Sequence, residues 1–328
     1  MNQMQIYRLP NVKESLHIYG RTGETEGGLF FDHTAAGIEF TAVIEGAVCL
    51  SIAQNHTTYY TVWVDGVRAG ERLTASGKAF EPVELARFGG YGVHTLRILR
   101  QTELQHSISV FRELSFRGHL LVPPRKAMYI EFLGDSITSG YGNRIASGQD
   151  GAGSAEAEDG TQTWAFLAAE QLNALCSVVS DSGIGVVNGY VPRTMAQFYA
   201  AQSYARPALG AFSPERVPDV VVINLGTNDE GVTPHKEMAV QVRALIQQVR
   251  GTYRTAVPIV WASGMMNAAC RPVVDEVLAC LGGEANRLYS LPLQGDAAGG
   301  GGHPGLAGHA ANADLLARFL RAKGLAKG

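Results

Sequence analysis

The stretch that decides the fold of this chain is Tyr129-Ile130-Glu131-Phe132-Leu133-Gly134-Asp135-Ser136-Ile137-Thr138. A largely apolar run of strand length ends at a glycine, and an acidic residue, a serine and a segment that can open a helix follow. A serine on such a strand-to-helix turn lies clear of the sheet edge and faces a helix N-terminus, where free N–H groups favour a developing oxyanion. This is the position at which an α/β hydrolase carries its nucleophile, so Ser136 is the first candidate catalytic residue.

Length and composition narrow the class of protein. The chain has 328 residues, which exceeds the usual size of a single core, so two domains are expected. A hydrophobic content of 46% with 17% charged residues is ordinary for a globular protein. The net charge of −3 gives no broad attraction to nucleic acid or to an anionic membrane, and neither partner is expected.

Localisation and metal binding are judged from what the sequence lacks. The N-terminus has no basic start followed by an apolar stretch, so the sequence as it stands predicts a cytoplasmic protein, or a secreted one if a leader has been removed. The four cysteines show no metal-ligand spacing. No metal and no cofactor are expected, and the oligomeric state is left open.

The first 125 residues favour an all-β domain. Short alternating or apolar runs occur at 29–31, 37–44, 47–53, 59–64, 93–99 and 107–114. Asp65-Gly66, Gly89-Gly90 and Tyr91-Gly92 supply turn residues between them. This spacing predicts an antiparallel sandwich. A proline-containing linker at 121–126 follows, so we expect domains at 1–125 and 126–328.

The second part alternates between strand and helix. Strands are expected at 129–133, 177–180, 220–225, 259–262 and 288–291, and helices at 163–175, 193–204, 234–249, 272–281 and 306–320. Five alternations predict a parallel sheet covered on both faces, with ligands bound at the carboxyl ends of its strands. The small and acidic residues of 143–160 predict a flexible loop that overhangs this site.

Four short signals lie at these strand ends or just before the last helix: Gly134-Asp135-Ser136, Ser182-Gly183-Ile184-Gly185, Gly226-Thr227-Asn228-Asp229 and Gly301-Gly302-His303-Pro304. Acyl transfer needs a nucleophile, a base and donors for the oxyanion. Ser136, His303, the Gly183 N–H and the Asn228 amide can supply these roles, and the parallel topology brings them to one edge.

In these four blocks the chain resembles the SGNH (GDSL-type) hydrolases, whose Ser, Gly, Asn and His match Ser136, Gly183, Asn228 and His303 in order. It is closer still to carbohydrate esterase family 2. The supporting strings are Gly134 to Gly142, Gly92 to Arg97 with Thr102-Glu103, and Ile259-Val260-Trp261 leading to Gly264-Met265-Met266. The resemblance implies a three-layer α/β/α, flavodoxin-like SGNH domain with a parallel sheet, preceded by an all-β jelly-roll sandwich. It also implies a carboxylic ester hydrolase of the acetyl xylan esterase type, acting on acetylated xylan- or glucomannan-type saccharides.

One departure from the SGNH pattern concerns the histidine. Most members carry an aspartate three residues before it, and here that position is Gly300. The His303 tautomer, with Nδ1–H donating and Nε2 facing Ser136, must still be fixed. A backbone carbonyl of the glycine-rich loop would give a Ser–His dyad, which is the arrangement we favour. Asp296 is the alternative orienter if the loop folds back.

Three aromatic residues are candidates for contact with a sugar: Trp261, Trp164 and Tyr141. Core packing is the alternative for each, since a lone aromatic usually buries its area for stability. In the mechanism we expect, Ser136 attacks the acetyl carbonyl with His303 as base, and the N–H groups of Ser136 and Gly183 hold the oxyanion with the Asn228 amide. The alternatives are a lipid or thioester acyl hydrolase, or a non-catalytic carbohydrate-binding protein.

Overall fold

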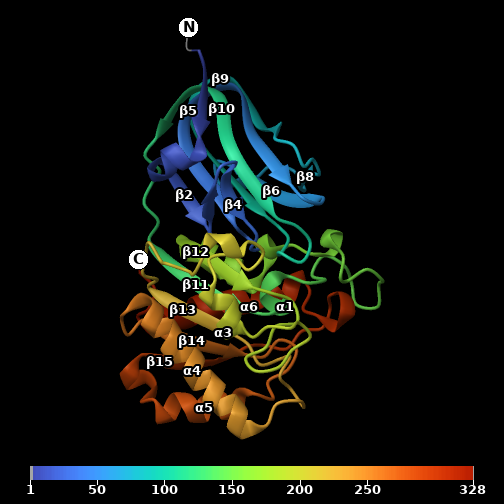
Figure 1. Cartoon of the computed structure of the whole chain (residues 1–328), viewed down its shortest axis with the longest axis vertical. Helices are drawn as coiled ribbons and strands as arrows, with labels where there is room; N and C mark the ends of the chain where they lie inside the picture. Colours follow the sequence, from blue (N-terminus) through green and yellow to red (C-terminus); the bar gives the residue numbers. More distant parts are fainter. Residues whose placement is uncertain (1–2, 328) are drawn as a thin grey trace. The chain divides into compact units, whose positions relative to one another are not determined.

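Two units make up the chain, Met1–Arg125 and Lys126–Gly328, in a computed structural model that describes residues 3–327 (Figure 1). The first contains strands and one short 3-10 segment, η1 (Leu9–Ser15), whereas the second alternates strands with helices. Among residues 3–327, no helix is both long and apolar enough to span a bilayer.

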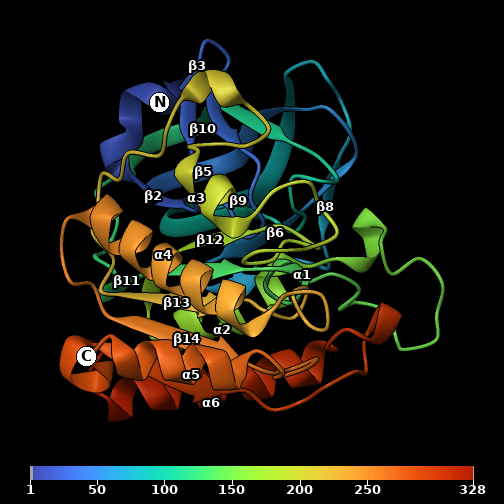
Figure 2. The same cartoon turned by 60° about the horizontal axis from the view of Figure 1, so that its bottom comes forward.

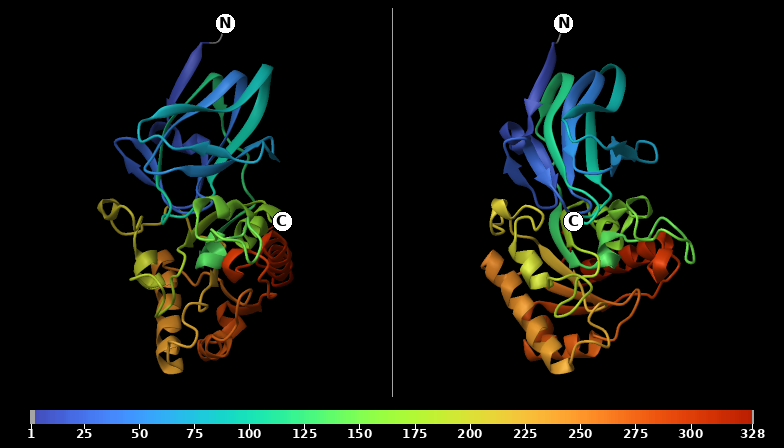
Figure 3. Two further views of the ribbon diagram at one scale, coloured as in Figure 1. Left: turned by 90° about the vertical axis from the view of Figure 1, so that its right-hand side faces the viewer. Right: turned by 45° about the vertical axis from the view of Figure 1, so that its right-hand side comes forward.

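The first unit is one curled, ten-stranded antiparallel sheet (Figure 3). Its main path runs β3-β4-β10-β5-β9-β6-β7, with β1, β2 and β8 paired to β10, β5 and β6. The strands are β1 (Met4–Arg8), β2 (Leu16–Tyr19), β3 (Gly23–Thr25), β4 (Gly28–Phe31), β5 (Gly37–Gln54), β6 (Thr58–Val64), β7 (Val67–Arg68), β8 (Leu73–Ala75), β9 (Glu81–Arg100) and β10 (Ser109–Leu121).

Two long strands correct the sequence prediction. The runs at 37–44 and 47–53 are one strand, β5, because the break at Gly46 is a bulge with φ +77° inside the ladder and not a turn. In the same way Gly89 to Gly92, expected as turns, continue through β9. Asp65-Gly66, with φ of +51° and +81°, does form the tight turn between β6 and β7.

The inner side chains of this sheet form one apolar core. Phe31 packs against Phe111 with ring centroids 5.0 Å apart, and Phe40 stacks on Phe116 at 6.3 Å. These rings belong to β4, β10 and β5, which are neighbours in the sheet. Alternate residues of the long strands thus pack into one core inside the curled sheet, as expected for an antiparallel sheet with one buried face.

The second unit is built on a five-stranded parallel sheet in the order β12-β11-β13-β14-β15. Its strands are β11 (Met128–Gly134), β12 (Ala174–Ser180), β13 (Val220–Asn224), β14 (Ile259–Ser263) and β15 (Leu288–Pro292). The helices are α1 (Ser136–Ser139), α2 (Trp164–Gln171), α3 (Met195–Ala200), α4 (His235–Tyr253), α5 (Arg271–Cys280) and α6 (Leu306–Ala322). The predicted alternation of strands and helices is confirmed.

Helix packing follows the apolar stripes. In α4 the predicted stripe of Met238, Val242, Leu245, Ile246 and Val249 is buried. α2 packs on α6, and α4 packs on α3 and α5 (Figure 2). The helix expected over 163–175 is shorter, because Asn173 turns the chain with φ +46° and β12 begins at the next residue.

β11, at the centre of the deciding stretch, carries a charged residue into the interior. Glu131 is fully buried, and its Oε2 accepts hydrogen bonds from the hydroxyls of Tyr199 at 3.0 Å and Tyr253 at 2.7 Å. Burial, with the nearby carboxylate, raises the pKa of Tyr253 far above its usual value, so its hydroxyl stays a donor. The carboxylate thus ties β11 to α3 and α4.

Glu131→Ala is expected to lower the free energy of unfolding by several kcal/mol, because two buried hydroxyls lose their acceptor at about 1–3 kcal/mol each. Urea unfolding of the full chain measures this change. The exposed Glu237→Ala on α4 is the control and should cost less than about 1 kcal/mol. Equal losses for the two variants would contradict the role given to Glu131.

Candidate active site

The nucleophile turn begins where β11 ends. Asp135 is the N-cap of α1, and its Oδ1 accepts the Ile137 N–H at 3.0 Å. A side chain at Gly134 would have its Cβ 2.0 Å from Thr138 Oγ1, so the turn closes only over a glycine. Ser136, 6% exposed, is the first residue of α1.

Strand register brings the predicted blocks to one edge of the sheet. Gly134 lies opposite Ser180 of β12 on one side and opposite Asn224 of β13 on the other. The segments that leave these three strands, with Ser136, Gly183 and Asn228, therefore start side by side, as parallel strands require.

His303 reaches this edge from the segment before α6. It follows the 3-10 turn η6 (Gly300–Gly302), and its Nε2 lies 2.9 Å from Ser136 Oγ. Its Nδ1 lies 3.3 Å from the Gly301 carbonyl oxygen. A carbonyl only accepts, so this contact assigns the proton to Nδ1 and leaves Nε2 free to accept from the serine. Burial lowers the pKa of His303 below its ordinary value near 6.5, which favours the neutral base at pH 7.

The segments that carry Gly183 and Asn228 are joined by a hydrogen bond between Asn228 and Ile184. Asn228 Nδ2 donates to the Ile184 carbonyl at 2.8 Å, which uses one of its two N–H groups. Gly183 has φ +83°, a conformation that favours glycine. Within residues 3–327, neither the Ser136 nor the Gly183 backbone N–H donates a hydrogen bond to the protein.

Asp229 braces this part of the edge. Its carboxylate accepts the backbone N–H groups of Val186, Val187 and Asn188, each at 2.8 Å. The residue is almost fully buried. The aspartate after Asn228 thus holds the segment after Gly183, and the two blocks are fixed to each other.

Asp296, the alternative orienter, lies on the backbone of the His303 segment. Its Oδ1 accepts the N–H of Ala298 at 3.1 Å and of Gly305 at 2.7 Å. No hydrogen bond joins its carboxylate to the His303 ring among the described residues. The geometry around His303 Nδ1 matches the backbone carbonyl, the arrangement that the sequence favours.

The three candidate aromatic residues differ in position. Trp164 and Trp261 are fully buried. Trp164 packs edge-on against Phe132 at 5.9 Å, and Trp261 Nε1 donates to the Leu225 carbonyl at 3.3 Å. Both therefore follow the core-packing alternative and offer no ring face to a sugar. Tyr141 lies at the site, with its ring 4.5 Å from the imidazole of His303.

The 143–160 segment is tied to the rest of the site. Asn143 and Asp159 close its ends through two hydrogen bonds, Asn143 Nδ2 to the Asp159 carbonyl at 2.9 Å and Asp159 N–H to Asn143 Oδ1 at 3.0 Å. Ser147 N–H donates to the Ala298 carbonyl at 2.8 Å. The segment thus packs on the loop that carries His303.

Tyr190 is a residue that sequence analysis missed. It is 87% exposed, and its N–H donates to the Gly183 carbonyl at 2.8 Å. An exposed aromatic ring is therefore held next to Gly183. Only the exposure of the ring distinguishes it from a core tyrosine, and no local pattern in the sequence carries that information.

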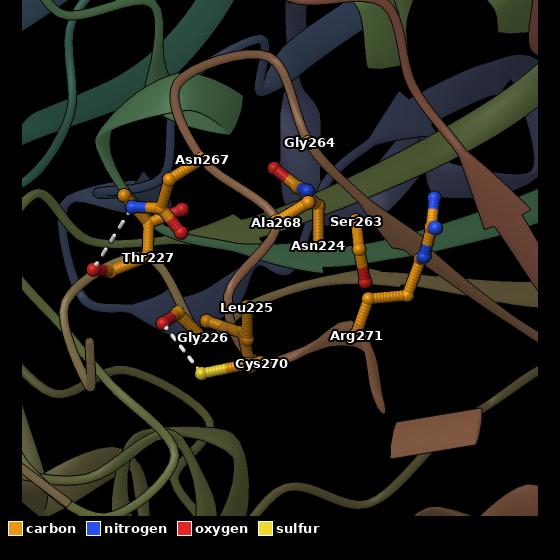
Figure 4. A pocket seen from close by; sticks show the side chains of 10 residues that line it. All are labelled: Asn224, Leu225, Gly226, Thr227, Ser263, Gly264, Asn267, Ala268, Cys270 and Arg271. Atoms are coloured by element: carbon orange, nitrogen blue, oxygen red, sulfur yellow. Dashed lines mark hydrogen bonds between the residues drawn. The ribbon is translucent and has the colours of Figure 1, made fainter. Parts of the chain in front are cut away.

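A pocket lies at the carboxyl ends of β13 and β14, and its lining includes Thr227, the residue before Asn228 in the chain (Figure 4). Its walls come from the ends of these strands, the segments that follow them and the start of α5. Asn267 Nδ2 contacts the Thr227 carbonyl at 3.5 Å, and Cys270 Sγ donates to the Gly226 carbonyl at 3.0 Å. These contacts hold the segment after β14 against the backbone that precedes Asn228.

Residues 132–311 match the model of the GDSL-like lipase/acylhydrolase family, over more than half of the chain. The chain belongs to this family. It is also 31% identical over 254 residues to the cellulase/esterase CelE of Acetivibrio thermocellus, a match that covers 71% of this chain but 30% of that protein. It is 26% identical over 273 residues to an acetylxylan esterase/glucomannan deacetylase of Cellvibrio japonicus, covering 76% and 74% of the two.

Solved structures extend the similarity to both units. A family two carbohydrate esterase from Clostridium thermocellum, in complex with cellohexaose, superposes with a TM-score of 0.84 at 26% identity, over 94% of this chain and 99% of that one. The family two carbohydrate esterase from Cellvibrio japonicus gives a TM-score of 0.86 over 98% of each chain, and at 19% identity it supports the fold alone. The resemblance to family 2 carbohydrate esterases is confirmed.

The pKa of the Asp135 carboxyl is well above that of an ordinary aspartate. Burial raises its pKa from 3.8 to about 7, the charge of Asp229 adds to the rise, and the Ile137 N–H opposes it. The folded protein thus binds this proton more tightly than the unfolded chain. The stability that Asp135 contributes is fully present below its unfolded pKa and is lost as the pH rises through its folded pKa.

Asp135→Asn is expected to keep the cap on Ile137 and to remove this loss. The difference in free energy of unfolding between variant and wild type should grow in favour of the variant from about pH 4 to about pH 7, by at most about 1.4 kcal/mol per pH unit, and then level off. Urea unfolding of both proteins across this range measures the difference. A difference independent of pH would contradict the raised pKa.

Proposed function

We propose that this chain is a serine esterase that removes O-acetyl groups from acetylated carbohydrates of the xylan or glucomannan type. One observation carries the proposal: His303 Nε2 lies 2.9 Å from Ser136 Oγ while Nδ1 faces the Gly301 carbonyl. A hydroxyl and a neutral imidazole in this geometry form the nucleophile and base that acyl transfer needs.

The catalytic steps follow from these positions. Ser136 Oγ attacks the acetyl carbonyl carbon as its proton passes to His303 Nε2. The N–H groups of Ser136 and Gly183 and the second N–H of the Asn228 amide stabilise the oxyanion. His303 then protonates the sugar oxygen as the C–O bond breaks. Water, deprotonated by His303, then attacks the acetyl-enzyme; the bond from the acetyl carbon to Ser136 Oγ breaks, His303 returns the proton to Oγ, and acetate leaves.

The proposed catalytic unit is a dyad. The carbonyl of Gly301 holds the Nδ1–H tautomer without a carboxylate. Loss of the aspartate from a triad costs about 10⁴ in kcat where the wrong tautomer results. A carbonyl that keeps the tautomer avoids that loss, and burial keeps the imidazole neutral at pH 7.

The substrate class rests on the relatives. A cellulase/esterase and an acetylxylan esterase/glucomannan deacetylase are similar in sequence, and a family two carbohydrate esterase bound to cellohexaose is similar in structure. Tyr190 and Tyr141 support a saccharide, because one ring is exposed beside Gly183 and the other lies against His303. An aromatic face is a common platform for a sugar ring.

The finer architecture belongs to the same proposal. We assign the second unit to a three-layer α/β/α arrangement, with α2 and α6 on one face of the sheet and α3, α4 and α5 on the other. The strand order β12-β11-β13-β14-β15 is that of flavodoxin-like folds. The curled antiparallel sheet of the first unit is assigned to a jelly-roll sandwich, with the domain boundary between residues 125 and 126.

Acetate release from a panel of acetylated sugars tests the function. Ser136→Ala should lower kcat by about 10⁴-fold or more without loss of the fold, since the nucleophile is gone. Ser139→Ala, which removes the hydroxyl one turn further along, is the matched control and should keep most of the activity. Acetate release that survives in Ser136→Ala would contradict the serine mechanism.

Two further outcomes separate the alternatives. A preference for octanoyl over acetyl esters in the same assay would favour a lipid hydrolase. Failure of a fluorophosphonate to label Ser136 would favour a non-catalytic carbohydrate-binding protein.

Tyr190→Ala is expected to raise KM for an acetylated oligosaccharide by about threefold to tenfold, since the loss of one stacked ring is worth about 0.5–1.5 kcal/mol. The kcat should change little, because the side chain is exposed and its backbone contact with Gly183 remains. Tyr190→Phe keeps the ring and should keep the KM of the wild type. Unchanged KM in Tyr190→Ala would argue against the contact with sugar.

A further inference from the structure

We infer that Asp296 is a positioning residue of this site, acting on His303 through the backbone of the loop that carries it and not through its charge on the imidazole. The inference rests on the proposed function, and it deepens it by assigning how the dyad is held without a third catalytic side chain.

Asp296 closes the loop at both of its ends. Oδ1 accepts the Ala298 N–H at 3.1 Å and the Gly305 N–H at 2.7 Å. The segment between these two residues contains Gly301, whose carbonyl faces Nδ1, and His303 itself. One carboxylate oxygen therefore fixes the separation of the two ends of the loop.

Asp296 is in turn anchored outside the loop. Its own N–H donates to the Met265 carbonyl at 2.8 Å, in the segment that follows β14. Within the loop, the Gly299 N–H donates to the His303 carbonyl at 2.8 Å. Because the run from Gly299 to Gly302 has no side chains to pack, backbone hydrogen bonds supply its rigidity, and Gly300 N–H adds one to the Gly142 carbonyl at 2.9 Å.

The charge of Asp296 is among the causes of the His309 pKa shift and not among those of the His303 shift. The groups that shift the pKa of His303 are its burial and the carbonyls of Gly301 and Gly300, with no carboxylate among them. Burial lowers the pKa of His309 of α6 to about 4 and outweighs the nearby charge of Asp296, which raises that pKa. At neutral pH His309 is uncharged, and its Nδ1 accepts the Trp164 N–H at 3.2 Å.

Gly308 leaves the space that the Asp296 side chain occupies. A Cβ on Gly308, inside α6, would lie 2.4 Å from Asp296 Cγ and 2.5 Å from its Cβ. Alanine in a helix interior is otherwise favoured over glycine. Gly308→Ala is therefore expected to displace Asp296 without changing its carboxylate and without weakening the helix.

Substitutions at Asp296 distinguish its hydrogen bonds to the loop backbone from an effect of its charge on the His303 imidazole. Asn keeps the Oδ1 acceptor, so Asp296→Asn should retain kcat within about threefold. Asp296→Ala removes the acceptor and should lower kcat by about 10²-fold, because a shift of the imidazole by about 1 Å is enough for this loss. KM should stay within about threefold in both variants, since Asp296 acts on the position of the base.

The pH profile of kcat/KM supplies a readout that a merely structural role would not move. With Asp296→Asn the acid limb, set by His303, should stay where it is in the wild type. Loss of a carboxylate next to the imidazole would instead lower the His303 pKa and move this limb to lower pH. A moved limb, or an Asn variant as inactive as the Ala variant, would overturn the inference in favour of a charge acting on His303.

Gly308→Ala covers the case in which Asp296→Ala fails to fold. It should lower kcat by about tenfold or more with little change in KM. Gly251→Ala, in α4 with no atom within 4 Å of the added Cβ, is the matched control and should match the wild type. Wild-type kcat in Gly308→Ala would overturn the inference.

The rate of Ser136 phosphonylation by a fluorophosphonate keeps this test separate from the proposed function. That rate depends on His303 and not on a sugar. Asp296→Asn should therefore be labelled at nearly the wild-type rate, and Asp296→Ala and Gly308→Ala should be labelled more slowly. If the wild type is labelled but releases no acetate from acetylated sugars, the proposed substrate is wrong. The labelling rates of the variants still test whether Asp296 positions His303.

Discussion

The hydrogen bond between His303 Nε2 and Ser136 Oγ joins residues that are 167 positions apart, and the arrangement of the second unit can be understood from what this bond needs. It needs a neutral imidazole with its proton on Nδ1, a serine at the sheet edge and a loop that brings the ring to it. Burial keeps the imidazole neutral, and the Gly301 carbonyl holds the tautomer. The turn at Gly134 presents the serine.

Loops at a sheet edge have backbone N–H groups that no strand satisfies, and such groups need acceptors when they are buried. Here aspartates supply them. Asp135 caps α1, Asp229 holds the segment at 186–188, and Asp296 holds both ends of the His303 loop. Each carboxylate acts on the backbone of a loop that carries a proposed catalytic group, so the rigidity of the site comes from side chains that do no chemistry.

The blocks around Ser136, Gly183, Asn228 and His303 could be predicted because a parallel sheet brings the ends of its strands to one edge, whatever their distance in sequence. The sequence left two candidate partners for His303 Nδ1, a backbone carbonyl of the glycine-rich loop and Asp296. Every residue has a backbone carbonyl, so residue types alone do not identify which one accepts this hydrogen bond. The burial of Trp164 and the exposure of Tyr190 depend on packing between distant segments, which composition and periodicity do not encode. The sequence predicted two strands where β5 is one, because a glycine such as Gly46 occurs both in a β-bulge and in a turn.

The ¹⁵N NMR spectrum of the full chain with labelled histidine tests whether His303 is the base for Ser136. His303 is assigned by comparison with a His303→Asn variant. At pH 7 His303 should be neutral, with its proton on Nδ1 and with Nε2 in the chemical-shift range of an unprotonated nitrogen that accepts a hydrogen bond. A proton on Nε2 at that pH would contradict it, because the imidazole could then not accept the proton of Ser136.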